Sequence, residues 1–186
     1  MTFDEREIND TFKEQAGELL AAYGLLGPEV FVTGSYFLDL MVCPDLDVHI
    51  PKEKSADLFA LAKSLYENGL TEEIWVMKGI KSGLPDADHI QIRTRLESHR
   101  AKWKIDLWRF PELAISAEMV EMNQLRKQLT ETARHEIIDL KRKLLQPNGF
   151  TPKYSGFHIY HAYLDKGIRD LSGMKAYLHG KGIIFV

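Results

Sequence analysis

Before Pro111 the hydrophobic residues of the chain follow both the period of strands and the period of helices, and after Pro111 they follow only the helical period. Before Pro111, short apolar stretches rich in β-branched and aromatic residues predict strands. The last two alternate cleanly and are separated by the polar segment 97–102, so they are expected to form an antiparallel hairpin. The expected strands cover residues 29–33, 45–50, 72–80, 89–96 and 103–110.

Apolar residues three and four positions apart predict helices on both sides of these strands. The first helix is expected to begin at a capping box formed by Thr2 and Glu5 and to end before Gly24. After Pro111 every pattern is helical, and the longest helix there is expected over about residues 130–145. The other expected helices cover residues 36–41, 54–68, 155–165 and 170–179.

These elements predict an α+β fold. We expect a mixed, largely antiparallel sheet of about four or five strands flanked by helices, followed by a C-terminal helical part. The change of pattern at Pro111 divides the chain into two expected domains, residues 1–110 and residues 111–186.

Composition narrows the class of protein. The chain has 186 residues, of which 45% are hydrophobic and 27% are charged, as in ordinary soluble globular proteins. Its net charge of -3, without a polybasic run, argues against binding to duplex DNA. The single cysteine excludes an internal disulfide and favours the cytoplasm, while the acidic start of the chain is unlike a signal peptide. No stretch is long and apolar enough to predict a membrane span.

Three aspartates stand where a divalent metal site would need them. Asp45 and Asp47 are two positions apart in an expected strand, so their side chains should point to the same face. Asp106 lies in the middle of an apolar strand, where a carboxylate without a partner would be costly. Magnesium prefers carboxylate oxygens, and two magnesium ions together neutralise and clamp a reacting phosphate group. The pattern therefore predicts a metal site that handles phosphates.

A Gly-Ser turn precedes the aspartate pair. Gly34 and Ser35 follow a buried strand and open a short helix, so their backbone N–H groups can receive phosphate oxygens. Lys104 lies two residues before Asp106 on the same strand face, and it either contacts the triphosphate or belongs to a solvated, charge-balanced face. His49 is expected to be a solvent-exposed residue at the end of its strand.

This combination of a Gly-Ser turn, Asp-x-Asp and one later aspartate resembles the nucleotidyltransferase superfamily related to DNA polymerase beta. The likeness is nearest to its small bacterial members, the minimal and the antibiotic-modifying nucleotidyltransferases, and it covers roughly residues 25–110. It implies that residues 1–110 are the catalytic domain and that the cofactor is two Mg²⁺ ions, with Mn²⁺ as a substitute. It also implies a nucleoside triphosphate substrate, with ATP favoured.

The resemblance assigns roles residue by residue. It makes Gly34 and Ser35 phosphate binders, and it makes the three aspartates metal ligands, with Asp106 also activating the acceptor hydroxyl. The chain departs from many relatives at Asp39, where they have a small residue, and at Pro44, where they have serine. Neither departure removes a metal ligand, but a carboxylate at position 39 adds a negative charge that could weaken phosphate binding.

The sequence therefore predicts a magnesium-dependent nucleotidyltransferase that moves NMP from an NTP to a hydroxyl group of a small molecule or protein and releases pyrophosphate. An alternative is a weakly active or inactive module of the same fold, serving as a nucleotide sensor or an antitoxin-like partner; Asp39 leaves this open. A nuclease or phosphatase is disfavoured, because the Gly-Ser turn suits a bound triphosphate.

Overall fold

A five-stranded mixed sheet forms the centre of the computed structural model, which describes residues 5–79, 86–96 and 101–185. The strand order is β1-β2-β5-β4-β3, with β2 and β5 parallel and every other neighbouring pair antiparallel. The expected hairpin is confirmed as β4 and β5. The strands are β1 (Phe31–Val32), β2 (Asp45–Pro51), β3 (Thr71–Lys78), β4 (Asp88–Arg95) and β5 (Lys102–Phe110).

Helices lie at the expected places, which confirms the α+β class. They are α1 (Glu5–Ala22), α2 (Gly34–Leu38), the 3-10 turn η1 (Lys52–Lys54), α3 (Leu58–Tyr66), α4 (Glu112–Gln128), α5 (Glu131–Lys143), α6 (Ser155–Leu164) and α7 (Leu171–Gly180). The expected capping residue Thr2 lies outside the described residues.

One expectation about the C-terminal helices is wrong. The longest of them is α4, with 17 residues, and not α5, which has 13. The apolar pattern of α4 is sparse, since only Ile115, Met122 and Leu125 are buried on it. A helix with so few buried residues gives a weak periodic signal in the sequence. The apolar stripe of α5 is stronger, so α5 was predicted to be the longest helix.

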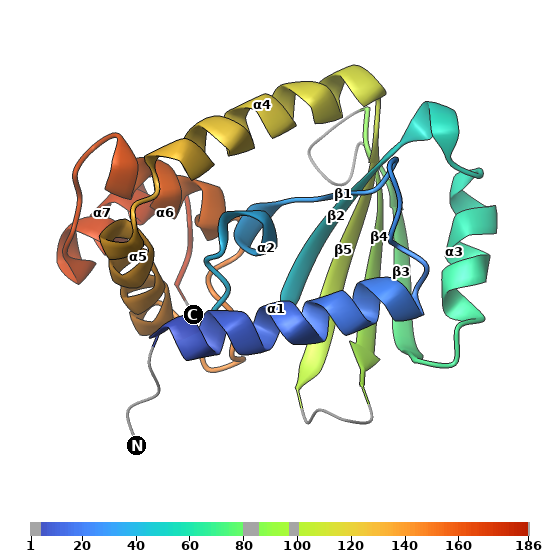
Figure 1. Ribbon diagram of the computed structural model, residues 1–186, viewed down its shortest axis with the longest axis horizontal. Coiled ribbons are helices and arrows are strands. Elements are labelled where there is room, and N and C mark those ends of the chain that lie inside the picture. The colour runs from blue at the N-terminus through green and yellow to red at the C-terminus, as the bar shows by residue number, and fades with distance from the viewer. Residues whose placement is uncertain (1–4, 80–85, 97–100, 186) are drawn as a thin grey trace.

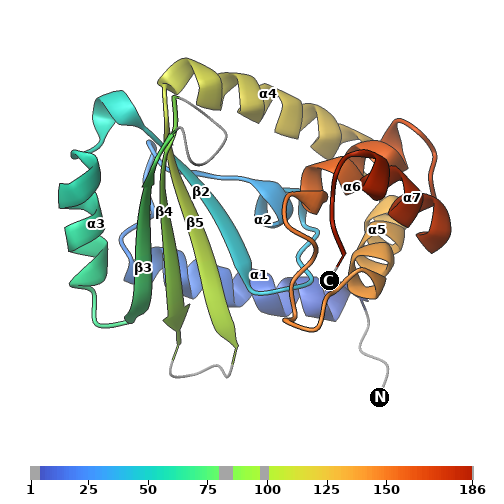
Figure 2. The same ribbon diagram turned by 180° about the vertical axis from the view of Figure 1, so that it is seen from behind.

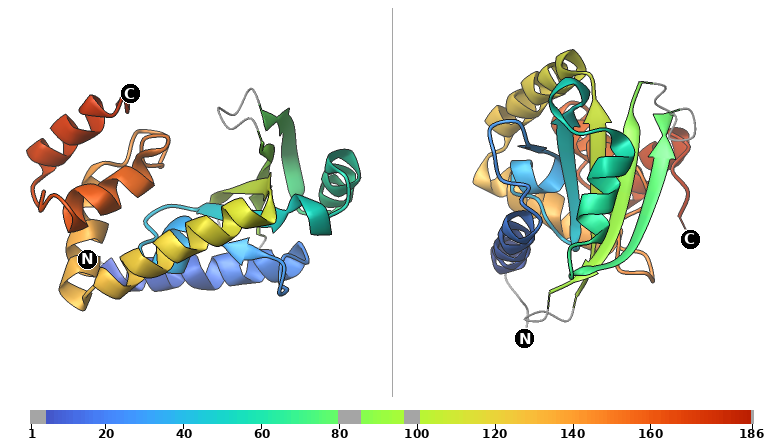
Figure 3. Two further views of the ribbon diagram at one scale, coloured as in Figure 1. Left: turned by 90° about the horizontal axis from the view of Figure 1, so that it is seen from above. Right: turned by 90° about the vertical axis from the view of Figure 1, so that its right-hand side faces the viewer.

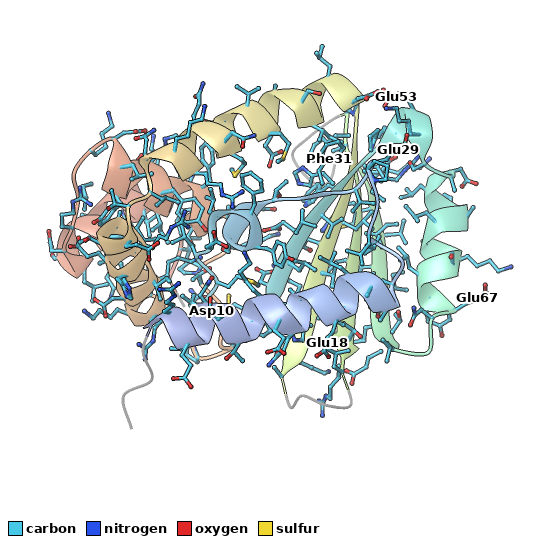
Figure 4. All side chains as sticks on the ribbon, viewed as in Figure 1. Asp10, Glu18, Glu29, Phe31, Glu53 and Glu67 are labelled. Atoms are coloured by element: carbon cyan, nitrogen blue, oxygen red, sulfur yellow. The ribbon has the colours of Figure 1, made fainter. Side chains whose placement is uncertain are left out.

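Alternation along the strands gives the sheet one apolar and one polar face. The apolar face packs against α1 and α3, as Figure 1 shows for the helix in front of the sheet and the helix beside it. Figure 4 shows Glu18 on α1 and Glu67 after α3 pointing away from this core. The buried residues from the strands are Leu46, Val48, Ile50, Ile90, Ile92, Trp103, Ile105 and Leu107.

The helices α5, α6 and α7 build a second hydrophobic core beside the sheet (Figures 1 and 2). Seen from above, α6 and α7 lie at one end of the molecule and α3 at the other (Figure 3). Leu38 at the end of α2 belongs to this second core, as do three residues of the segment between α2 and β2: Leu40, Val42 and Cys43. The segment that leads into the aspartate pair is therefore fixed by the C-terminal helices. No helix in the described part of the chain has the length and apolar character needed to cross a membrane.

Candidate metal and nucleotide site

The three aspartates come together on the polar face of the sheet. β2 and β5 run in parallel, and their register places Asp47 directly beside Asp106. One oxygen from each of Asp45, Asp47 and Asp106 lies within 4.8 Å of the others. The convergence expected from strand alternation is therefore present in the structure.

Asp106 is buried and surrounded by donors. Its Oδ1 accepts from Gln91 Nε2 at 2.8 Å and lies 2.9 Å from His89 Nε2, and its Oδ2 lies 2.8 Å from Lys104 Nζ. Burial alone would raise the pKa of Asp106, but the hydrogen bond from His89 and the charge of Lys104 outweigh it and lower the pKa well below the ordinary range. Asp106 is therefore ionised at neutral pH.

Lys104 lies between two of the carboxylates. Its Nζ is 2.9 Å from Asp45 Oδ2 and 2.8 Å from Asp106 Oδ2. Burial lowers the pKa of Lys104, but the attraction of these two carboxylates is stronger and raises the pKa above the usual lysine range. The ammonium group is thus a permanent positive charge within the aspartate cluster.

The other two carboxyl groups, those of Asp45 and Asp47, lack enough positive charge around them to favour their ionised forms. Burial raises the pKa of Asp45, although Lys104 partly offsets this. Burial, together with repulsion from Asp45 and Asp106, raises the pKa of Asp47 to about 8. Asp45 Oδ1 is buried and has no hydrogen-bond partner in the part of the chain that the structure describes.

This donor set fits a divalent metal ion. A buried oxygen without a partner and carboxyl groups with raised pKa values show that the cluster lacks positive charge. All the converging ligand atoms are carboxylate oxygens, which Mg²⁺ prefers.

The Gly-Ser turn lies against the cluster. Gly34 has φ +58, and a Cβ atom placed on it would be 2.7 Å from Asp47 Oδ2. The N–H of Thr33 donates to the carbonyl of Asp47 at 2.9 Å, so the start of α2 is tied to β2. Glycine is needed at position 34 both for its backbone conformation and for the close approach of Asp47.

A buried lysine and a tyrosine, which sequence reasoning missed, meet Ser35. Lys141 Nζ donates to Ser35 Oγ at 2.7 Å, to Tyr160 OH at 3.1 Å and to the carbonyl of Leu40 at 2.6 Å. Tyr160 OH also lies 2.9 Å from Ser35 Oγ. Lys141 is 2% exposed, so its charge is removed from bulk water. We call Ser35, Lys141 and Tyr160 the α2 clamp.

The sequence did contain a signal for Lys141. The residue lies four positions after Ile137 and three before Leu144, both of which are buried, so it falls on the apolar stripe of α5. A lysine in such a stripe needs a buried partner, as charged side chains are seldom fully buried without one. Tyr160 carries no comparable signal, because buried tyrosines are common in helices.

Two expectations about neighbouring residues need correction. His49 is buried and not exposed, because α4 crosses the end of β2 and places Glu118 3.1 Å from His49 Nδ1. Asp39 does not add an unbalanced charge to the cluster. It has φ 59 and pairs with Lys13 and Arg134 in a pocket of about 420 Å³ between α1 and α5, whose lining includes none of the three clustered aspartates.

Comparisons with known proteins address the fold. No protein-family model matches the chain. No curated protein matches its sequence. Among solved structures, Cid1 poly(U) polymerase with bound MgGTP has a TM-score of 0.50 and 15% identity over 80% of this chain and 48% of the polymerase chain. JHP933 from Helicobacter pylori has a TM-score of 0.39 and 17% identity, over 89% of this chain and 88% of its own.

The chain thus spans about half the length of the polymerase chain that it matches. The likeness concerns the arrangement of strands and helices, since so few residues are identical. From this likeness, and from the mixed five-stranded sheet with its flanking helices, the chain has the nucleotidyltransferase fold.

Proposed function

We propose that the protein is a nucleotidyltransferase that transfers NMP from a nucleoside triphosphate, with ATP favoured, to a hydroxyl group of a small molecule or protein. The observation that carries the proposal is the meeting of three carboxylates, within 4.8 Å, with the start of α2. A carboxylate cluster alone would suit many metal-binding proteins. A cluster beside a Gly-Ser turn and a buried lysine suits a triphosphate.

Asp45, Asp47 and Asp106 would hold the metal, for which Mg²⁺ is the natural candidate. When bound, it neutralises the triphosphate and the charge that develops as the bond to the leaving group breaks.

The α2 clamp and Lys104 would bind the other phosphate oxygens. Lys141 already has its ammonium group 2.7 Å from Ser35 Oγ, so the clamp presents a fixed charge where Ser35 and the N–H groups of the turn would receive phosphate. Fixed charges need no rearrangement during the reaction, which makes them effective in phosphoryl transfer. The C-terminal helices would thus supply part of the nucleotide site through α5 and α6.

The reaction follows from these positions. The acceptor oxygen forms a bond to the α-phosphorus, and the bond from that phosphorus to the oxygen bridging to the β-phosphate breaks, releasing pyrophosphate. The proton of the acceptor hydroxyl passes toward Asp106, which is ionised and therefore able to accept a hydrogen bond from it. His89 and Gln91 hold the other oxygen of Asp106 and fix its orientation.

Label transfer tests the proposal. The protein is incubated with Mg²⁺ and ATP labelled in the α-phosphate, together with panels of hydroxyl-bearing metabolites, aminoglycosides and proteins. We expect label to appear on an acceptor, and we expect Asp47→Asn to reduce the rate by about a hundredfold or more. Asp139→Asn, an exposed aspartate on α5 that pairs with Lys143, is the matched control and should retain the rate.

Nucleotide binding measured without turnover distinguishes the enzyme from the main alternative, a nucleotide sensor. If Mg²⁺ and ATP raise the melting temperature but no acceptor becomes labelled, a nucleotide sensor replaces the enzyme as the interpretation. If Asp47→Asn transfers label at the wild-type rate, the assignment of the aspartates is wrong.

A further inference from the structure

The ammonium group of Lys104, between Asp45 and Asp106, contacts a carboxylate oxygen that a metal ion would need as a ligand. Asp106 has two carboxylate oxygens. Oδ1 already accepts a hydrogen bond from Gln91 Nε2 and lies within hydrogen-bond distance of His89 Nε2. The remaining Oδ2 is the atom that lies 2.8 Å from Lys104 Nζ. Asp45 differs, because Lys104 faces its Oδ2 and leaves the buried Oδ1 without a partner in the described part of the chain.

A metal held by all three aspartates would therefore compete with Lys104. The ammonium group and the metal would both need Asp106 Oδ2, and two cations that close together repel each other. The side chain of Lys104 is 19% exposed and has a flexible four-carbon stem, so it is able to move.

We propose that Lys104 is an internal counterion that holds the aspartate cluster without metal and is exchanged for metal when the triphosphate enters. This rests on the proposed function, because the triphosphate supplies the new partner for the displaced ammonium group. Metal alone takes Asp106 Oδ2 from Lys104 and brings no new anion for the ammonium group. Metal that arrives with a triphosphate brings that anion, so the two ligands bind cooperatively.

The proposal differs from a purely structural role for the ion pairs. A lysine fixed in these ion pairs would repel the metal to the same extent with and without nucleotide. An exchangeable counterion competes with metal, so its loss must increase the affinity for metal alone. The change in metal affinity caused by a nucleotide analogue, compared between the wild type and a variant without Lys104, therefore distinguishes the two roles.

Titration with Mn²⁺ in the absence of nucleotide, followed by electron paramagnetic resonance of free Mn²⁺, provides the test. We expect Lys104→Met to bind Mn²⁺ about tenfold more tightly than the wild type, because a competing unit charge is removed from the ligand oxygens. Lys102→Met is the matched control. Lys102 lies on the same strand and pairs with Glu72 and Glu73, so this variant has the same change of net charge away from the cluster and should bind as the wild type does.

Lys104→Arg serves as a second variant if Lys104→Met does not fold without metal. It keeps the positive charge, and it should bind Mn²⁺ no more tightly than the wild type. Equal or weaker Mn²⁺ binding by folded Lys104→Met would overturn the proposal, as would tighter binding by Lys104→Arg or by Lys102→Met.

Cooperativity gives a readout that is independent of turnover. A non-hydrolysable ATP analogue should increase Mn²⁺ affinity more in the wild type than in Lys104→Met, because only the wild type has an ammonium group to transfer to the phosphates. An equal increase in both proteins contradicts the exchange. If the exchange is observed but no acceptor is labelled, the proposed reaction fails while the role of Lys104 stands.

Discussion

Replacing Asp47 by asparagine should stabilise the metal-free protein, and the gain should grow as the pH rises. Asp47 is surrounded by carboxylates, and no ion pair to its side chain is found within residues 5–79, 86–96 and 101–185. Asparagine has nearly the same shape but no charge. The variant therefore removes the repulsion and leaves the packing intact.

The pKa of Asp47 sets the magnitude. Its rise from 3.8 to about 8 means that the folded protein binds this proton more tightly than the unfolded chain does. The free energy of unfolding of the wild type therefore falls as the pH rises between these values, by about 1.4 kcal/mol per pH unit. From pH 5 to pH 8.5 this amounts to at most about 4 kcal/mol, and solvent around the partly exposed carboxyl group lowers the expected gain to about 2 kcal/mol.

Urea unfolding followed by tryptophan fluorescence, in EDTA at several pH values, measures this difference. The free energies of unfolding of the two proteins should differ least near pH 5, and the Asp47→Asn variant should be the more stable protein near pH 8.5. Asp10→Asn, at an exposed position on α1, should show no such growth with pH. A variant that is less stable than the wild type near pH 8.5 would show that the Asp47 carboxylate is stabilised in the folded protein, and it would refute the reasoning.

Two further substitutions test the turn and the α2 clamp. Gly34→Ala should lower the free energy of unfolding by about 2 kcal/mol through backbone strain, and its new methyl group should weaken Mn²⁺ binding through contact with Asp47. Gly149→Ala is the control, because Gly149 has φ +82 and nothing lies within 4 Å of the added Cβ atom. It should show the strain alone in urea unfolding. Tyr160→Phe removes a hydroxyl that contacts Ser35 and Lys141, so binding of an ATP analogue with Mg²⁺ should weaken about tenfold in calorimetry. Tyr163 lies on the same helix as Tyr160, and its hydroxyl donates to Glu136 of α5. Tyr163→Phe should therefore bind the analogue as the wild type does, and equal losses in both variants would contradict a role for the clamp.

The part of the site that lies on strands was predictable from sequence. Strand side chains alternate with a period of two, so the spacing of Asp45 and Asp47 fixes a common face once the strand is recognised. Asp106 could be recognised because it is a carboxylate in an otherwise apolar strand. Its parallel pairing with Asp47 was not predicted, and it is the structure that places β5 beside β2.

The part of the site that lies on helices was harder to predict. Lys141 and Tyr160 are separated from Ser35 by more than a hundred residues, and no spacing in the sequence connects them. Asp39 and His49 were misjudged for the same reason. Their environments are set by Lys13 and Glu118, on helices whose packing on the sheet is a tertiary property.

The position of β5 between β2 and β4 has a consequence for folding during synthesis. The central strand of the sheet is the last of the five to leave the ribosome, so the chain up to about residue 100 has two separated pieces of sheet with exposed strand edges. Pairing of β2 with β5 joins residues about sixty positions apart and is expected to be slow. Until β5 is inserted, the nascent chain has no metal site, and its unpaired edges make this interval the one in which chaperones would matter most.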